Sequence, residues 1–317
     1  MPDSENKTLV AAAQATPVFL DKKATVEKAC DIIREAGQKG ARLIVFPEVF
    51  ISGYPDWVWV VPNSRANILN ELYAKLVANS LSIPDKFTEQ LAKAAKAAKI
   101  YVIMGMHERN NEASNASLYN TLLFIDDKGQ IVGKHRKLIP TGGERLIWAA
   151  GDGSTLHSFQ TPFAKIGGLI CWENYMPLAR YAMYAWGTQI LAAPTWDKSD
   201  SWLLSLQHIA REGGLFVIGC CTALRLNDIP DSYEFKQFYP PNKEWLNPGK
   251  SCIINPQGEF ITGPVENKEE ILYAEIDLNK ILESKRMFDV AGHYARPDIF
   301  QFSLNQQPYL NINPTKS

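Results

Sequence analysis

The sequence predicts an α/β fold in one domain. Short apolar runs rich in β-branched residues alternate with amphipathic helical patterns through the first two thirds of the chain, and hairpin signals recur towards its end. No internal repeat or low-complexity linker divides the 317 residues. A chain of this length can bury roughly three quarters of its unfolded surface in a core. We therefore expect sheet layers covered by helices in a single domain.

The first half of the chain predicts strands and helices in alternation. Apolar runs indicate buried strands, and a 3.6-residue period indicates helices. A loop rich in aromatic residues follows the second of these strands, after Pro47 and Glu48. The expected strands lie at 9–15, 43–46 and 100–106, and the expected helices at 22–37, 63–79 and 84–99.

The second half adds hairpins to this alternation. Turn residues at 126–129 and 255–258 indicate two of them. A loop from 227 to 249 carries four prolines, and long loops of this kind are usually functional or interfacial. No periodicity is visible from about residue 289, which predicts an extended arm. The expected strands are 122–125, 131–136, 156–160, 164–170, 189–193, 216–221, 251–254, 259–262 and 271–276, and the expected helices begin at 177, 201 and 278.

Composition excludes several classes of protein. Hydrophobic residues make up 46% and charged residues 21%, as in globular proteins, and the net charge of −1 favours neither nucleic acid nor an anionic membrane. Residues 1–7 lack a basic segment followed by an apolar one, and no apolar run approaches the roughly 20 residues of a membrane span. We expect a cytoplasmic protein with no nucleic-acid or membrane partner.

The cysteines predict neither a disulfide framework nor a metal site. Their number is odd, and they are widely scattered in an apolar chain. No CxxC or His/Cys ligand spacing occurs, so no zinc site is expected. The five cysteines are Cys30, Cys171, Cys220, Cys221 and Cys252.

Cys171 stands where α/β proteins place their chemistry. The apolar run 164–170 predicts a buried strand that ends at this cysteine, and Pro177 then opens a helical pattern. Backbone N–H groups in the intervening turn can face a developing anion. A free cysteine is equally often a small buried hydrophobe, so this stretch alone leaves both readings open.

Three charged residues at strand ends or in the following loops favour the nucleophile. Glu48, Lys137 and Glu144 would each be a solvated surface charge if considered singly. Together with Cys171 they can form a catalytic group. A carboxylate shielded from water, such as Glu48, can take the proton of the thiol. A lysine can stabilise the thiolate and the negative charge that develops when the thiolate attacks an unsaturated carbon. The two carboxylates would keep Lys137 charged.

The basic run from Lys134 to Lys137 allows two further interpretations. His135 is a rival base in a Cys–His pair, because strand alternation puts it on the same face as Lys137. Lys134 and Arg136 face the other side, which opposes a single phosphate-binding patch.

With these residues in place, the chain resembles a nitrilase of the carbon–nitrogen hydrolase superfamily. The superfamily's Glu–Lys–Cys triad matches Phe46-Pro47-Glu48, Lys134-His135-Arg136-Lys137 and Cys171-Trp172-Glu173, and Glu144 matches its second glutamate. The late segment from Gly292 to Asp298 is also nitrilase-like. The resemblance extends over nearly the whole chain.

The resemblance implies a four-layer α-β-β-α sandwich. Residues 1–288 would form the hydrolase domain, and residues 289–317 the C-terminal arm, at a subunit interface. It further implies a homodimer or a larger spiral homo-oligomer. Neither a cofactor nor a metal is expected.

The residues of this chain suggest the walls of a substrate pocket beside Cys171. We expect substrate contacts from Trp172, whose backbone N–H would hold the developing anion, and from residues of the neighbouring loops. Trp196 is expected to narrow the pocket, and Trp57, Trp59 and Trp148 to add apolar walls. The alternative is that some of these aromatic residues belong to the core. The remaining candidates for substrate contact are Tyr54, Trp57, His135 and Thr195.

The implied activity is hydrolysis of a small-molecule nitrile to the carboxylic acid and ammonia, through a thioimidate and then a thioester on Cys171. An amidase-type hydrolase using the same four residues is the alternative within the superfamily. A catalytically silent oligomeric scaffold is the alternative from another class.

Overall fold

Two β-sheets face each other in the computed structural model, which describes residues 6–310. Each has three parallel strands at its centre and antiparallel strands at its edges. The first sheet has the order β13 (Glu270–Asp277), β1 (Lys7–Gln14), β2 (Leu43–Val45), β3 (Tyr101–Arg109), β4 (Leu118–Ile125) and β5 (Ile131–Arg136). The second has the order β10 (Ala223–Arg225), β11 (Trp245–Ile254), β9 (Phe216–Cys221), β8 (Ile190–Thr195), β7 (Lys165–Gly168) and β6 (Phe159–Gln160), with β12 (Phe260–Glu266) paired to β11.

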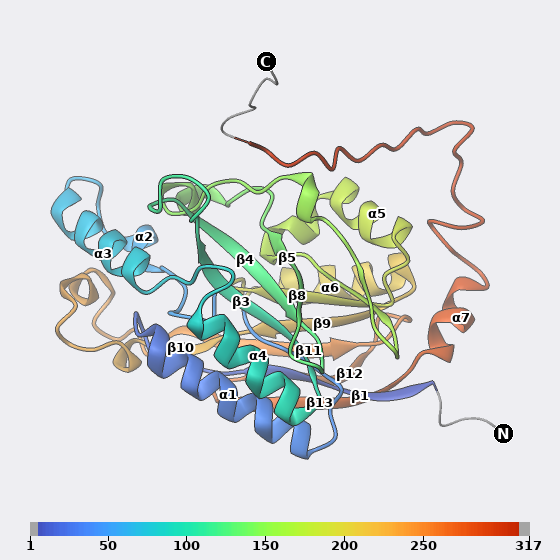
Figure 1. Ribbon diagram of the computed structural model, residues 1–317, viewed down its shortest axis with the longest axis horizontal. Coiled ribbons are helices and arrows are strands. Elements are labelled where there is room, and N and C mark those ends of the chain that lie inside the picture. Colours follow the sequence, from blue (N-terminus) through green and yellow to red (C-terminus); the bar gives the residue numbers. More distant parts are fainter. Residues whose placement is uncertain (1–5, 311–317) are drawn as a thin grey trace.

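Helices cover the outer face of each sheet (Figure 1). Helices α1 (Lys22–Gln38) and α4 (Lys86–Ala98) bury their apolar faces on the first sheet, and α5 (Pro177–Ala185) and α6 (Asp200–Gly213) on the second. A third apolar layer, which includes Val45 and Ile218, fills the space between the sheets. The predicted four-layer α-β-β-α sandwich in one domain is confirmed.

Side-chain caps explain where the covering helices begin. Asp21 accepts the Ala24 N–H at the start of α1, and Asp85 forms a reciprocal capping box with Thr88 at the start of α4. Ser199 caps α6, and Pro177 occupies the first turn of α5. The helix boundaries therefore differ from the sequence prediction by only a few residues.

One loop prediction and one strand prediction need correction. Antiparallel pairing of β10 with β11 shortens the expected 227–249 loop to residues 226–244, because β11 begins at Trp245. The register of this pair shifts between Leu224, opposite Asn247, and Arg225, opposite Trp245. The expected strand 156–160 is reduced to Phe159 and Gln160, because a 3-10 turn occupies Gly153–Thr155.

The remaining elements lie at the periphery. Helix α3 (Ala66–Ala78) matches the helix expected at 63–79, a short helix α2 (Trp57–Val60) lies in the aromatic-rich loop before it, and α7 (Asn279–Lys285) precedes the arm. Residues 289–310 form neither helix nor strand and run past α5 (Figure 1); the rest of the expected arm, 311–317, lies outside the described residues. Within residues 6–310, no helix is both long and apolar enough to cross a bilayer.

The carboxyl ends of the central strands from both sheets meet at one end of the sandwich. Glu48 follows β2, Cys171 follows β7, and Thr195 ends β8. Lys137 comes directly after β5 in the first sheet. This arrangement gathers residues that are distant in sequence, as expected where parallel strands end.

Close backbone packing holds the loop that carries Glu48. The amide of Ile51 donates to the Gly105 carbonyl of β3 over 3.1 Å. A Cβ at Gly105 would overlap the carbonyl oxygen of Pro47 and lie 2.8 Å from the amide nitrogen of Val49. Only glycine allows the loop to approach β3 this closely.

We therefore expect Gly105→Ala to lower the free energy of unfolding by about 3 kcal/mol, at the upper end of the cost of overpacking, because backbone atoms cannot move aside. Urea denaturation measures this change. Gly40→Ala is the control: a Cβ there meets no atom within 4 Å, so only its left-handed backbone, with φ of +87°, is strained. Equal losses in the two variants would contradict the close-packing account.

Candidate active site

A buried lysine forms the centre of the site. The Lys137 ammonium donates to Glu48 Oε1 over 3.0 Å and to Glu144 Oε2 over 2.7 Å. All three side chains are at most 2% exposed. Burial opposes the charge on Lys137, but Glu48, Cys171 and Glu144 outweigh it and raise the pKa of the lysine. The lysine is therefore an ammonium with one N–H donor still available after its two ion pairs.

Glu48 is held by donors from both sheets. Its Oε1 also accepts from Asn120 Nδ2 of β4 over 2.7 Å, and its Oε2 accepts from the Trp196 amide, just after β8, over 2.7 Å. Burial raises the pKa of Glu48 while Lys137 lowers it, and the net shift is upward. A carboxylate with a raised pKa in a dry site is suited to general-base catalysis.

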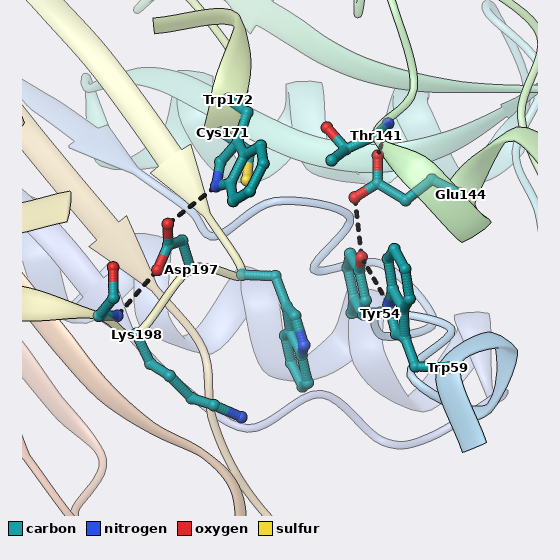
Figure 2. A pocket seen from close by; sticks show the side chains of 10 residues that line it. Tyr54, Trp59, Thr141, Glu144, Cys171, Trp172, Asp197 and Lys198 are labelled. Atoms are coloured by element: carbon teal, nitrogen blue, oxygen red, sulfur yellow. Dashed lines mark hydrogen bonds between the residues drawn. The ribbon is translucent and has the colours of Figure 1, made fainter. Parts of the chain in front are cut away.

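Glu144 is fixed in place by the loop that carries it. Its Oε2 accepts from the Thr141 amide over 2.7 Å as well as from Lys137. Its Oε1 accepts from the Tyr54 hydroxyl over 2.7 Å, and the Trp59 indole in turn donates to that hydroxyl over 3.2 Å (Figure 2). Both carboxylate oxygens are thus occupied, which favours a positioning role for Glu144.

Cys171 has a backbone conformation that is unusual for a side-chain-bearing residue. Its φ is +52°, in the left-handed region, at the first residue of a 3-10 turn. Cys171 lines a cavity, although the residue is only 5% exposed. Burial, reinforced by the charge of Glu48, raises the pKa of the thiol to about 12, and Lys137 opposes that rise. The resting residue is therefore a thiol near neutral pH.

The cavity beside Cys171 has a volume of about 380 Å³ and largely aromatic walls. Tyr54 and Trp196 stack with their ring centroids 4.5 Å apart and form one wall. Figure 2 shows Cys171 and Trp172 on the side of the cavity opposite Tyr54 and Trp59. The lining residues are Tyr54, Trp59, Thr141, Glu144, Cys171, Trp172, Trp196, Asp197, Lys198 and Ser199.

The structure places His135 behind the catalytic turn and not in the cavity. Its Nε2 bonds to the Glu173 carboxylate at 3.0 Å, and its Nδ1 lies 3.2 Å from the Thr155 carbonyl. Burial lowers the pKa of His135, but Glu173 more than compensates, so the pKa is raised. Both ring nitrogens are occupied, which corrects the expectations of His135 as a rival base or substrate contact.

Trp57 and Trp148 also lie away from the substrate cavity. Trp57 lines a separate cavity of about 290 Å³, which corrects its predicted substrate contact. Trp148 is buried with its ring 5.8 Å from the Lys137 ammonium, and its indole donates to His107 Nδ1 over 3.0 Å. His107 in turn bonds to the Gly53 carbonyl at 2.9 Å, so the pair supports the loop that carries Tyr54.

Sequence reasoning missed two residues that hold the catalytic groups. Asn120 was hidden inside an apolar strand, although a lone amide at 118–125 was a signal that something polar is buried there. Glu173 accepts the amides of Ile170 over 2.7 Å and Leu138 over 2.5 Å, besides His135. It therefore ties the turn of Cys171 to the residue after Lys137.

The chain matches known proteins over nearly its full length. Residues 9–286 match the family described as carbon-nitrogen hydrolase. An aliphatic nitrilase of Sinorhizobium fredii (strain HH103) is 42% identical over 304 residues, which cover 95% of this chain and 97% of the relative. A bifunctional nitrilase/nitrile hydratase NIT4A of Nicotiana tabacum is 42% identical, over 94% of this chain and 87% of the relative.

A solved structure supports the fold independently. The crystal structure of Saccharomyces cerevisiae Nit3, a member of branch 10 of the nitrilase superfamily, superposes with a TM-score of 0.72. Its sequence is 21% identical, and the match covers 91% of this chain and 97% of that one. At 21% identity, this superposition is evidence for a shared fold alone.

The buried His135–Glu173 pair makes a testable contribution to stability. The pKa of Glu173 is lowered, since His135 and two backbone amides outweigh burial. Because the pKa of His135 is raised, the histidine contributes its full stabilisation of the fold below about pH 6.5. Because the pKa of Glu173 is lowered, the glutamate contributes its full stabilisation above about pH 4.5. The stabilisation by the pair is therefore greatest between these values. It declines as the pH rises through the pKa of His135 in the folded protein, and as the pH falls through that of Glu173.

We expect Glu173→Gln to lower the free energy of unfolding by about 3 kcal/mol at pH 5.5, because it leaves a buried histidine without its counter-charge. The deficit should be smaller at pH 9. Urea denaturation at the two pH values measures it, with Glu283→Gln in the exposed pair with Lys280 as a control that changes little. A deficit that grows with pH would contradict the ion-pair account.

Proposed function

The chain belongs to the carbon–nitrogen hydrolase family, in its nitrilase branch, and on this premise we propose that it converts an organic nitrile to the carboxylic acid and ammonia through a covalent intermediate on Cys171. It is a hydrolase acting on carbon–nitrogen bonds. The observation that carries the proposal is the convergence of Glu48, Lys137, Glu144 and Cys171 in one buried cluster, of which Glu144 and Cys171 line the cavity. A protein without chemical function has no physical need for this costly arrangement of charges.

The reaction begins with a proton transfer. Glu48 takes the proton of the Cys171 thiol as the sulfur attacks the nitrile carbon, so that the high pKa of the thiol does not require a free thiolate in the resting enzyme. The nitrile nitrogen gains the negative charge and then takes the proton back from Glu48, which gives a thioimidate and restores the Glu48 carboxylate. The remaining N–H of Lys137 and the backbone N–H of Trp172 stabilise the charge as it develops.

Two water molecules complete the turnover. The first adds to the thioimidate with Glu48 as base and gives a tetrahedral intermediate, from which ammonia departs to leave a thioester. The second hydrolyses the thioester, releases the carboxylic acid and returns the sulfur to the thiol. Glu144 holds Lys137 in position throughout, through the 2.7 Å ion pair. The aromatic walls of the cavity accept an apolar substituent of the nitrile, with Tyr54 and Trp196 as the stacked surface.

We expect Cys171→Ala to abolish turnover and to leave the fold intact, because it removes the nucleophile and little volume. Release of ammonia and the identity of the product, from a panel of aliphatic, arylacetic and aromatic nitriles and their amides, measure the loss. Cys30→Ala on α1 is the matched control and should retain activity. Turnover retained in Cys171→Ala would refute the assignment, and activity of the wild type on amides alone would favour an amidase.

We also propose that the arm and α5 form a face between copies of the chain. Large apolar side chains are exposed there, with Leu178 69% and Phe300 73% exposed. A groove of about 840 Å³ lies between α5 and the arm, and Tyr181 contacts Phe302 edge-to-face at 5.1 Å across it. Apolar surface of this extent is typical of a protein interface. We propose a homodimer, or a larger homo-oligomer, assembled through this face.

Leu178→Asp should therefore shift the protein to a smaller species, because it places a charge in the apolar centre of the proposed face. Size-exclusion chromatography with light scattering gives the mass, and circular dichroism verifies the fold. Ile261→Asp on β12, which is exposed elsewhere, is the control. A wild type that is monomeric at all concentrations, or a Leu178→Asp variant of unchanged mass, would argue against this interface.

A further inference from the structure

Thr195 contacts the reacting atom without a role in the steps above. It ends β8 and is 2% exposed. Its hydroxyl oxygen lies 3.2 Å from Cys171 Sγ and donates a hydrogen bond to the sulfur. This contact differs from the substrate contact that the sequence suggested, since Thr195 is not among the residues that line the cavity.

Neighbouring hydrogen bonds fix the direction of this hydroxyl. The amide of Asp197 donates to Thr195 Oγ1 over 2.9 Å, and Cys171 Sγ is the acceptor that the hydroxyl proton reaches. Asp197 is itself held, because its carboxylate accepts from the Trp172 indole over 2.8 Å and from the Ser199 amide over 2.8 Å (Figure 2). The donor is therefore positioned before the reaction begins.

A hydrogen bond of this kind distinguishes the states of the sulfur. It is stronger to a thiolate than to a thiol or to the neutral sulfur of a thioimidate or thioester. Against the larger effect of burial, the Thr195 hydroxyl lowers the pKa of Cys171. The bond consequently strengthens whenever the carbon–sulfur bond breaks and the electron pair returns to sulfur.

We propose that Thr195 is a catalytic residue that sets the partition between acid and amide, an inference that rests on the proposed function. In the tetrahedral intermediate the carbon carries sulfur, oxygen and nitrogen. If the C–N bond breaks, the electron pair goes to the protonated nitrogen, ammonia leaves and the thioester proceeds to acid. If the C–S bond breaks, the pair goes to sulfur, the amide leaves and the thiolate regains its proton. The hydroxyl stabilises only the second departure.

The test compares Thr195→Val, which keeps the shape and removes the donor, with Thr195→Ser, which keeps the hydroxyl. Chromatography with mass detection gives the ratio of amide to acid from an electron-poor nitrile. We expect the ratio to fall about tenfold in the valine variant, which corresponds to about 1.4 kcal/mol, and to recover in the serine variant. A second readout is the pH dependence of Cys171 alkylation by iodoacetamide, which should shift to higher pH in the valine variant only.

The control is Thr222→Val, which removes an equally buried hydroxyl that donates to the Ala15 carbonyl over 2.8 Å. It should leave both the ratio and the alkylation profile unchanged. A wild-type alkylation profile in Thr195→Val, or an unchanged ratio where the wild type forms amide, overturns the proposal. If a folded wild type turns over no nitrile, the proposed function fails, and the alkylation profile alone still decides whether Thr195 acts on the sulfur.

Discussion

The buried ammonium of Lys137 is the constraint on which the site depends. A charge without solvent is stable only if counter-charges and hydrogen bonds replace the water, and Glu48 and Glu144 supply them at 3.0 and 2.7 Å. Two carboxylates and one ammonium give the cluster a net negative charge. In addition to burial, this charge opposes ionisation of the Cys171 thiol. The same electrostatics therefore keep the nucleophile protonated at rest and place its base nearby.

The sandwich supplies this cluster because both sheets end their parallel strands at one place. Glu48 and Lys137 come from the first sheet, and Cys171 from the second. Glu173 joins the two across the interface through the amides on either side. The left-handed backbone at Cys171, and at Val49 beside Glu48, costs about 1–3 kcal/mol at each position and persists because the surrounding packing fixes it.

Much of this architecture could be predicted from the sequence, and the failures have physical causes. Strand runs and helix periods follow local chemistry, so most elements and the placement of Glu48 and Cys171 at strand ends could be predicted. The partners of His135 could not, because strand alternation gives a face but does not show what packs against it. Asn120 and the Thr195 hydroxyl act through contacts over 72 and 24 residues of sequence separation, which no local pattern contains.

Nucleophilic catalysis by Cys171 requires a covalent intermediate that can be trapped. Acid quenching during turnover of a slow nitrile, followed by intact-mass and peptide mass spectrometry, reports what is bound and where. We expect the peptide that contains Cys171 to gain the mass of the nitrile as a thioimidate, or the mass of the acyl group less one hydrogen as a thioester. An adduct on another cysteine, or steady turnover with no adduct under conditions that trap thioesters, would contradict nucleophilic catalysis by Cys171.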